Sequence, residues 1–387
     1  MRPERVYLDY NALAPVRPEA RDALVRSLGL GGNPSSVHDE GRSARQTVER
    51  ARAAIARSIG AKPDNVTFTA GATEANATVL TPEWRDFDQT VSFEALLVGA
   101  TEHPSVLAGG RFDPDRIETL PVDRNGCLDF AALDKRLAAV GGPVLVSVML
   151  ANNETGTIND IRAIADRVHD SGGFLHTDAV QALGRLSVDM EALGADSISV
   201  SAHKIGAIAG AGAIVTRPGI AIPALVHGGG QEGYRRAGTE NVGAIAAFGA
   251  VLEGIDGLNA ENARIRSLRD WLARKLAHIS EDLIVFGDTV NRLPNTICFA
   301  VPGVKAETAM IAFDLDGIAV SSGSACSSGK VAASHVLAAM GVDPTDAAGA
   351  IRVSLGWSTT EKDIERFLQS FQKLCKNHRP QGQTKAA

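Results

Sequence analysis

The chain has 387 residues, 44% of them hydrophobic and 22% charged, and is long enough for two domains with sizeable cores. Its 45 acidic and 39 basic side chains leave a net charge of -6, which argues against a nucleic-acid partner. The N-terminus lacks the apolar core of a signal peptide, and no apolar run approaches the roughly 20 residues that cross a membrane, so we expect a cytoplasmic protein without a membrane partner.

The N-terminal part of the chain predicts an irregular segment, then a helix and a strand. Residues 1–35 look irregular because Pro15 and Pro18 interrupt them. Ser43–Ile59 predicts a helix, since four apolar side chains recur on one face of it: Val48, Ala51, Ile55 and Ile59. Asn65–Thr69 is rich in β-branched and aromatic residues and predicts a short strand.

A glycine turn follows this strand and opens another helix at Gly71–Asn76. A strand, a tight turn and a helix start leave unpaired backbone N–H groups and the positive end of the helix dipole directed at one point. Thr73 adds a hydroxyl there. The turn is therefore a candidate anion site, and a capped helix that holds no ligand is the alternative.

The middle of the chain alternates strands with helices, which predicts a parallel sheet. Val144–Leu150 is a continuous apolar run, as in a sheet buried on both faces. A helix is expected near Ile161–Ser171. The other expected strands are Ala95–Ala100, Gly173–Asp178, the strand from Asp196 that ends before Lys204, and Gly212–Thr216, with a glycine-rich loop at Ile205–Gly212.

Polar side chains follow the ends of four of these strands. They are Glu102 and His103, Asn152 to Glu154, Asp178 and Gln181, and His203 and Lys204. Ligands bind at the carboxyl ends of strands in open α/β sheets, and a partly desolvated lysine there readily forms a Schiff base. Considered singly, Lys204 fits a solvated loop edge, Asp178 a helix cap and His103 a surface histidine. Their repetition along one rim of the sheet predicts a shared ligand site.

The pattern changes after about residue 255. Asn259–Ile279 predicts a long amphipathic helix, with one apolar face formed by Ile265, Leu268, Leu272 and Leu276. Short apolar segments and a loop of small residues that runs through Lys330 come next; the segments are Asn295–Phe299, Ala309–Leu315, Gly317–Ser321 and Ala350–Leu355. Together they predict a smaller α+β domain that closes against the first.

Four cysteines are widely spaced along the chain: Cys127, Cys298, Cys326 and Cys375. They form no Cys-x-x-Cys pair and have no zinc-finger spacing, so neither a disulfide framework nor structural zinc is expected. Cys326 lies in Ser321–Lys330, a run of small residues with little capacity to pack, and we expect a mobile, exposed loop with an accessible thiol. The other three cysteines fit buried small hydrophobic residues better.

Ten motifs lie in one order along nearly the whole chain: Tyr7–Tyr10, Gly32–His38, Phe68–Glu74, Thr101–His103, Asn152–Glu154, Asp178–Gln181, Ser201–Lys204, Arg236–Thr239, Ser321–Cys326 and Ile351–Gly356. With them the chain resembles the cysteine desulfurases of the NifS/IscS group, in the class V aminotransferase branch of the fold-type-I pyridoxal phosphate enzymes. The resemblance implies an α/β fold, with a large domain built on a mostly parallel seven-stranded sheet flanked by helices and a smaller α+β C-terminal domain. We accordingly expect a large domain at 12–255, a small domain at 1–11 and 256–375 that carries the cysteine loop (about 321–333), and a flexible tail at 376–387.

For the site, the resemblance implies a pyridoxal phosphate cofactor. Lys204 would form the Schiff base and later act as the base, Asp178 would bind the pyridine nitrogen and Gln181 the ring hydroxyl. His103 would stack on the ring and take part in catalysis. The phosphate would be held by Ala72, Thr73, Ser201 and His203, with Thr239 reaching in from the other subunit of a homodimer with composite active sites. The carboxylate of the substrate, L-cysteine, would be bound by Arg352 with Asn153, which also contacts the cofactor, and Asn33.

The resemblance makes Cys326 the nucleophile. Its thiolate would attack the sulfur of the bound cysteine, release L-alanine and keep the sulfur as a persulfide. The loop would then deliver this sulfur to an iron–sulfur scaffold or another sulfur-acceptor protein, for iron–sulfur cluster assembly or thiolation. No resident metal is expected, although Cys326 can transiently ligate a nascent cluster together with a scaffold. The alternative is a selenocysteine lyase or another class V enzyme.

Three features depart from the family pattern. Ile205–Gly212 stands where the family has a Gly-Pro-Lys-Gly turn, so the shape of that turn and a positive charge at the rim of the site are in question. Leu13 replaces a threonine, and the C-terminal tail does not match the end with which the family docks on scaffolds. The identity of the acceptor therefore stays open.

Overall fold

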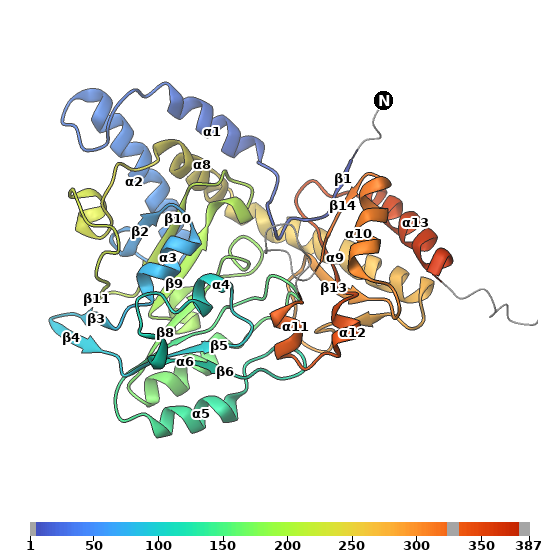
Figure 1. Cartoon of the computed structure of the whole chain (residues 1–387). Coiled ribbons are helices and arrows are strands. Elements are labelled where there is room, and N and C mark those ends of the chain that lie inside the picture. Colours follow the sequence, from blue (N-terminus) through green and yellow to red (C-terminus); the bar gives the residue numbers. More distant parts are fainter. Residues whose placement is uncertain (1–4, 323–332, 379–387) are drawn as a thin grey trace, which may run out of the picture.

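The computed structural model describes residues 5–322 and 333–378 of the chain. Figure 1 shows a larger body next to a smaller one that contains the C-terminal helices. The larger body is built on a seven-stranded sheet in which every neighbouring pair is parallel except the two pairs made by the second strand in sheet order. In that order its strands are β2 (Val66–Thr69), β10 (Gly212–Thr216), β9 (Ser197–Ser201), β8 (Phe174–Asp178), β7 (Val144–Ser147), β5 (Ala95–Gly99) and β6 (Ile117–Leu120). The predicted α/β fold with a mostly parallel sheet is confirmed.

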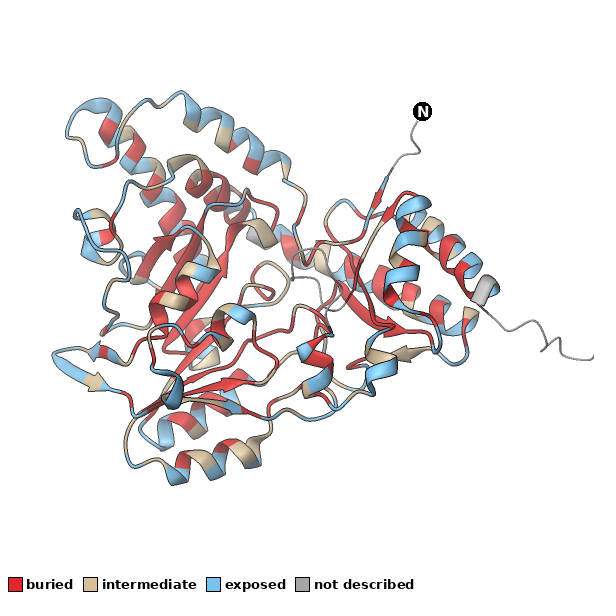
Figure 2. Cartoon of the chain, in the orientation of Figure 1, coloured by how far each residue is buried: buried red, intermediate tan, exposed pale blue. Residues whose placement is uncertain are grey.

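The sheet is buried on both faces, as the red strands of Figure 2 show. In β7 the side chains alternate between two cores: Val144 and Val146 belong to the core on one face, and Leu145 to the core on the other. This confirms the prediction made from the apolar run at Val144–Leu150, although the strand ends at Ser147.

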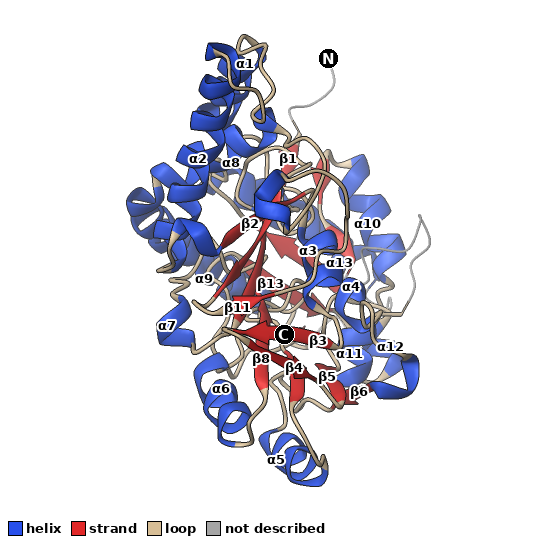
Figure 3. Ribbon diagram, turned by 90° about the vertical axis from the view of Figure 1, so that its left-hand side faces the viewer, coloured by secondary structure: helices blue, strands red, loops and turns tan. Residues whose placement is uncertain are grey.

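Helices cover each face of this sheet. One core receives side chains from α1 (Pro18–Leu28), α2 (Asp39–Ile59), α5 (Phe130–Ala139), α6 (Ile161–Asp170), α7 (Met190–Leu193) and α8 (Val242–Glu253). The other face is covered by α3 (Ala72–Val79), α4 (Pro104–Leu107) and a three-stranded sheet of β11 (Ile220–Ala221), β3 (Glu83–Asp86) and β4 (Gln89–Ser92). Figure 3 shows the strands of the large sheet between α6 on one side and α3 and α4 on the other.

The prediction that residues 1–35 are irregular is wrong, because α1 lies within them. Pro18 occupies the first turn of α1, where its missing N–H would have had no partner and its φ is already helical. Ala20 and Ala23 are buried, and Ala20 joins the core beneath the helix. The proline therefore marks a helix start. Strand β6 and helix α5 were also not predicted from the sequence.

The smaller body has an antiparallel sheet in the order β12 (Ile284–Val285), β13 (Thr296–Ala300), β16 (Ile351–Ser354) and β15 (Ser321–Ser322). Its helices are α9 (Ile255–Ile279), α10 (Ala306–Leu315), α11 (His335–Ala339), α12 (Pro344–Ala347) and α13 (Glu361–His378). The predicted amphipathic helix is confirmed as α9, whose apolar face is buried at Ile265, Leu268, Leu272 and Leu276.

The N-terminal segment belongs to this second core although α1 and α2 lie on the first. Strand β1 (Val6–Tyr7) pairs in parallel with β14 (Ile318–Ala319), and Val6 and Leu8 are buried among the side chains of α9, α10 and α13. The chain then crosses to the large sheet within the next ten residues, as the blue trace in Figure 1 shows. Residues 9–12 therefore lie where the two bodies meet.

Candidate active site

Most of the predicted site residues line one cavity with a volume of about 950 Å³. They are Ala72, Thr73, His103, Asn153, Asp178, Gln181, His203, Lys204 and Arg352. The cavity lies at the carboxyl edge of the large sheet, because Asp178 ends β8, His103 follows β5 and Lys204 follows β9, and these strands are parallel. The lining also contains residues that were not assigned from the sequence, among them Asn11, Ala12, Glu154, Ser334 and His335.

Three predicted site residues within the described part of the chain do not line this cavity, and a fourth lies outside the described residues. Ser201 ends β9, and its hydroxyl is 2.9 Å from Nδ1 of His203. Asn33 and Thr239 are exposed and do not line the cavity within this chain. Cys326 lies outside the described residues. The roles expected for these four residues stay predictions.

Lys204 reaches the N-terminal segment. It lies on a single turn of 3-10 helix, Ala202–Lys204, directly after β9, and its Nζ donates to the carbonyl oxygens of Asn11 (2.8 Å) and Ala12 (2.7 Å). Burial, and next the charge of Lys204, lower the pKa of the neighbouring His203 to about 4. His203 is therefore neutral at physiological pH.

Asp178 is held by two donors. Its Oδ2 accepts from Nδ2 of Asn76 at 2.9 Å and its Oδ1 from the backbone N–H of Val180 at 2.9 Å. The side chain is almost fully buried, yet it lines the cavity. A carboxylate fixed in this way can accept a further hydrogen bond from a donor in the cavity.

His103 presents a neutral ring to the cavity. Its Nδ1 accepts from the backbone N–H of Ser105 at 3.1 Å, and the Ser105 hydroxyl is 2.8 Å away. Because a backbone N–H can only donate, the proton of the neutral ring lies on Nε2. Burial lowers the pKa of His103. The charge of Asp178 raises this pKa, and the charges of Lys204 and His335 lower it further. The ring is therefore suited to stack on an aromatic ligand.

The glycine turn before α3 is open to the cavity. Gly71 stands at the N-cap and has no side chain with which to cap the helix, and Ala72 and Thr73 line the cavity. A Cβ on Gly212 would lie 2.7 Å from Gly71 Cα and 2.8 Å from the Val200 carbonyl oxygen, so β10 packs against this turn only as glycine. The turn fits a phosphate, since helix N–H groups without side-chain caps bind anions.

The unusual turn after Lys204 also reaches the cavity. Ala209 and Gly210 line it, and they belong to the stretch Ile205–Gly212 that stands where the family pattern has a Gly-Pro-Lys-Gly turn. This rim therefore carries no charge from the turn. As predicted, residues 205–211 form neither a helix nor a strand.

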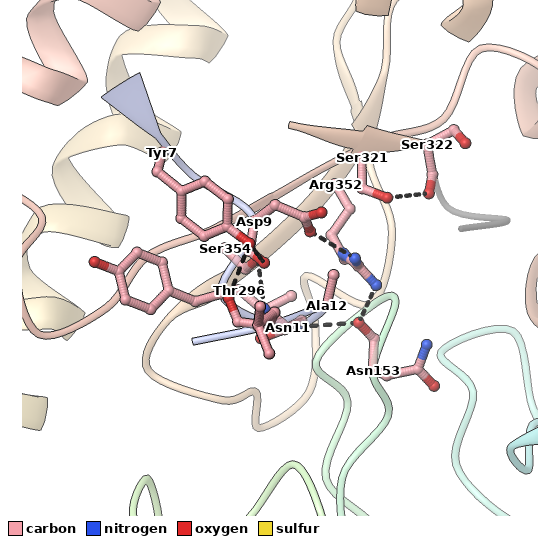
Figure 4. A network of polar contacts seen from close by, with 12 residues as sticks. Tyr7, Asp9, Asn11, Ala12, Asn153, Thr296, Ser321, Ser322, Arg352 and Ser354 are labelled. Atoms are coloured by element: carbon pink, nitrogen blue, oxygen red, sulfur yellow. Dashed lines mark hydrogen bonds and ion pairs between the residues drawn. The ribbon is translucent and has the colours of Figure 1, made fainter. Parts of the chain in front are cut away.

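Arg352 is tied to the N-terminal segment, as Figure 4 shows. It lies on β16 with a relative exposure of 2%, and its Nη2 forms an ion pair with Asp9 Oδ1 at 2.8 Å. Its Nη1 donates to the carbonyl oxygen of Asn153 at 3.0 Å. Within residues 5–322 and 333–378, its Nε has no hydrogen-bond partner. The guanidinium is thus oriented and still has donor capacity for a ligand.

Asn11 connects the two bodies and was missed as a site residue. Its side chain donates to the Asn153 carbonyl oxygen (3.0 Å) and the Thr296 hydroxyl (2.9 Å) and accepts from Asn295 (3.0 Å). Its own carbonyl oxygen accepts from Lys204 and from Nε2 of Gln181 (3.1 Å). The signal in the sequence was its place directly after the first motif, Tyr7–Tyr10.

Glu154 is a buried acid in the same wall. Burial raises its pKa to about 7, against the effects of a hydrogen bond from the Ser334 hydroxyl (2.5 Å) and of the charge of Arg352. Its position in Asn152–Glu154 was noted in the sequence, but its burial depends on α11, which follows far along the chain. The site therefore contains an acid that titrates near neutral pH.

Two general findings concern the described residues alone. Among them, no three or more His, Cys, Asp or Glu side chains are placed to hold a metal ion. No helix in the described part of the chain combines the length and apolar character that a membrane crossing requires.

Comparison with known proteins finds similarity over almost the whole chain. The family described as class-V aminotransferases matches residues 6–367. The chain is 39% identical over 379 residues to the cysteine desulfurase IscS of Dictyoglomus turgidum, which covers 97% of this chain and 95% of that one. It is 37% identical over 370 residues to the IscS-like cysteine desulfurase of Mycobacterium tuberculosis, 94% of each chain. A NifS-like protein from Rickettsia africae has a similar structure, with a TM-score of 0.87, 33% identity, and 96% of this chain and 100% of that chain covered.

Proposed function

The chain belongs to the class-V aminotransferase family, as its motifs predicted, and on this premise we propose that it is a pyridoxal-phosphate-dependent cysteine desulfurase. The enzyme takes sulfur from L-cysteine, releases L-alanine and carries the sulfur as a persulfide on Cys326. Relatives of similar length that bear the name cysteine desulfurase support this activity.

The observation that carries the proposal is that Lys204, Asp178 and His103 line one cavity with Arg352. Pyridoxal phosphate would supply the electron sink for bonds at the substrate α-carbon. Asp178 would accept from the pyridine nitrogen, His103 would cover the ring, and Lys204 would hold the aldehyde carbon. The open start of α3, with Thr73, would hold the phosphate together with Ser201 and His203. Gln181 would contact the ring hydroxyl, since its Nε2 is a donor beside Asn11.

Substrate binding would use the other side chains of the cavity. Arg352 would bind the carboxylate of L-cysteine, with Nε and the remaining Nη protons as donors. The Asn153 side chain lines the same cavity and its carbonyl oxygen fixes Arg352. Arg352 would thus set the orientation of the amino acid, and Lys204 would take the proton from its α-carbon.

The quaternary structure and the acceptor are part of the proposal. Thr239 and Asn33 are exposed on this chain, which supports a homodimer in which a second copy completes each site. The two separate cores support a large domain at 12–255 and a small domain at 1–11 and 256–375. The persulfide would pass to an iron–sulfur scaffold or another sulfur-acceptor protein in the cytoplasm.

The test is production of alanine and sulfide from L-cysteine with a reductant, on the wild type beside Cys326→Ser. Equimolar products that vanish in Cys326→Ser, while the cofactor absorbance is unchanged, would establish the activity. Cys127→Ser is the matched control, since this half-buried cysteine lies outside the cavity lining, and it should keep full activity. No product from a wild type that still binds the cofactor would contradict the proposal, and selenocysteine would then be tried as the substrate.

A further inference from the structure

A buried asparagine lies directly behind the cavity wall. Asn76 is on α3, its relative exposure is 0%, and its amide uses all of its hydrogen-bonding capacity. Nδ2 donates to Asp178 Oδ2 (2.9 Å) and to the Ser105 hydroxyl (2.9 Å). Oδ1 accepts from the Ser199 hydroxyl and lies 3.2 Å from Nε2 of His176. One amide therefore joins groups from α3, α4, β8 and β9.

The direction of each hydrogen bond in this network follows from Asp178. A carboxylate only accepts, so Nδ2 of Asn76 must face Asp178, and Oδ1 must face Ser199 and His176. An amide oxygen also only accepts, so His176 carries its proton on Nε2. Its Nδ1 then accepts from the Ser197 hydroxyl at 2.8 Å. Burial lowers the pKa of His176 to about 3, which is consistent with a neutral ring.

A second branch of the network leads to His103. Because Nδ2 of Asn76 donates to the Ser105 oxygen, the Ser105 hydroxyl proton is available for Nδ1 of His103, 2.8 Å away. That proton and the backbone N–H of Ser105 both favour the neutral form of His103 with its proton on Nε2. The same amide thus contacts Asp178 directly and reaches His103 through the Ser105 hydroxyl.

Helix α3 adds a third connection. Asn76 lies three residues after Thr73, one turn along the helix whose start is open to the cavity. The helix therefore carries the phosphate-binding turn at its N-terminus and the amide that orients Asp178 in its interior. A ligand bound at both places is held by one rigid element.

We propose that Asn76 is a positioning residue for the reaction: its amide orients Asp178 toward the ring nitrogen of pyridoxal phosphate and, through Ser105, sets the tautomer of His103. The inference rests on the proposed function. Asn76 does not line the cavity, so it acts through Asp178 and Ser105, which it contacts and which do line the cavity.

Three variants test this role. Asn76→Ala removes both branches, Ser105→Ala removes only the branch to His103, and Ser147→Ala is the matched control. Ser147 is buried on β7 in register with His176, and within the described part of the chain its hydroxyl has no partner. Its loss therefore removes a buried hydroxyl beside the network without breaking it.

Two measurements separate positioning from mere support of the fold. The apoprotein is titrated with pyridoxal phosphate by absorbance, and the pH profile of kcat/KM is recorded for L-cysteine. Asn76→Ala should weaken cofactor binding on the order of tenfold, as expected for one hydrogen bond to a charged group. Ser105→Ala should move the acid limb of the profile upward by about half a pH unit, because His103 loses a donor that favours its neutral form. Asn76→Ala should move it in the same direction, because the Ser105 hydroxyl loses the contact that orients its proton toward His103. Ser147→Ala should change neither the cofactor affinity nor the acid limb of the profile.

Cofactor affinity and a pH profile for Asn76→Ala that both match Ser147→Ala would overturn the inference. If Asn76→Ala does not fold, Ser105→Ala decides, since an unchanged acid limb in that variant removes the branch to His103. A wild type that binds no pyridoxal phosphate would instead overturn the proposed function, and the inference with it. The two failures are therefore distinguishable.

Discussion

Two groups of residues that line or support the cavity are built in different ways. The Asp178 cluster (Asn76, His103, Ser105, His176, Asp178 and Ser199) comes from the large sheet and the helices on one of its faces, and the amide at its centre is fully paired. The Arg352 cluster (Tyr7, Asp9, Asn11, Asn153 and Arg352) joins the N-terminal segment to both bodies. Figure 4 shows how Asp9 and Asn153 meet at the guanidinium.

The difference concerns what each cluster leaves for a ligand. The Asp178 cluster is complete before any ligand binds, and its hydrogen bonds have one possible direction. In the Arg352 cluster, Nε of Arg352 has no partner among the residues described, and the adjacent Glu154 has a pKa of about 7. The first cluster is therefore suited to hold a cofactor in a fixed orientation, whereas the second retains an unpaired donor, Nε of Arg352, that a substrate carboxylate can use.

The largest expected effect comes from Arg352→Ala. Removing the cation that meets the substrate carboxylate should lower kcat/KM for L-cysteine on the order of a thousandfold, as for a buried charge pair that loses one partner. The affinity for pyridoxal phosphate should stay within about twofold of the wild type, because the Asp178 cluster does not depend on Arg352. Steady-state kinetics and absorbance titration measure the two quantities. Arg352→Lys keeps the charge and loses the planar guanidinium, so its kcat/KM should lie between those of the wild type and Arg352→Ala.

An equal loss of cofactor affinity in Arg352→Ala would contradict the comparison, since the two clusters would then depend on each other.

The next effect concerns Glu154→Gln and the pH dependence of stability. The pKa of Glu154 rises from 4.5 to about 7 on folding, so its contribution to stability is fully present below pH 4.5 and is lost as the pH rises through 7. Between pH 4.5 and pH 8 the wild type should lose on the order of 3 kcal/mol relative to Glu154→Gln. Urea unfolding of both proteins at pH 4.5, 6 and 8 measures this difference.

The control for this experiment is Glu281→Gln, at an exposed residue beyond the end of α9. Its stability should follow the wild type at every pH. If the difference between Glu154→Gln and the wild type is the same at the three pH values, Glu154 does not titrate as the burial of its side chain requires.

The smallest effect is expected from Asp9→Asn. The substitution removes the ion pair that orients Arg352 but leaves the bond to Asn153, so KM for L-cysteine should rise about tenfold with little change in kcat. Tyr7→Phe is the control: the Tyr7 hydroxyl donates to the carbonyl oxygens of Asp9 and Leu13 and leaves the guanidinium contacts in place. A lower KM in Asp9→Asn would mean that Asp9 competes with the substrate for Arg352.

The sequence predicted the rim of the sheet better than the elements around it. Strands β5, β7, β8, β9 and β10 were predicted, and with them the positions of His103, Asp178 and Lys204. These predictions succeeded because apolar strands and the polar residues that end them are neighbours in sequence. Strand β6 was missed since Ile117–Leu120 mixes polar and apolar residues in four positions. Helix α1 was missed because a proline predicts irregular structure in most positions but is favoured in the first turn of a helix.

Asn76 shows what the sequence did not reveal. In the motif Gly71–Asn76 it is an ordinary polar residue of a helix, yet its partners Ser105, Asp178 and Ser199 lie 29, 102 and 123 positions away. Asn11 is similar, since its partners Asn153, Lys204 and Thr296 lie 142, 193 and 285 positions away. No local pattern distinguishes such residues from polar residues in water.

The sequence by itself determined most strands of the large sheet, the placement of reactive side chains at strand ends and the family. These follow from periodicity and from motifs that are contiguous in the chain. The tertiary structure decided which polar groups are buried, which donor faces which acceptor and which segment completes the site. Hydrogen bonds and pKa values depend on distance and on exclusion of water, and these are set only when segments far apart in sequence pack against one another.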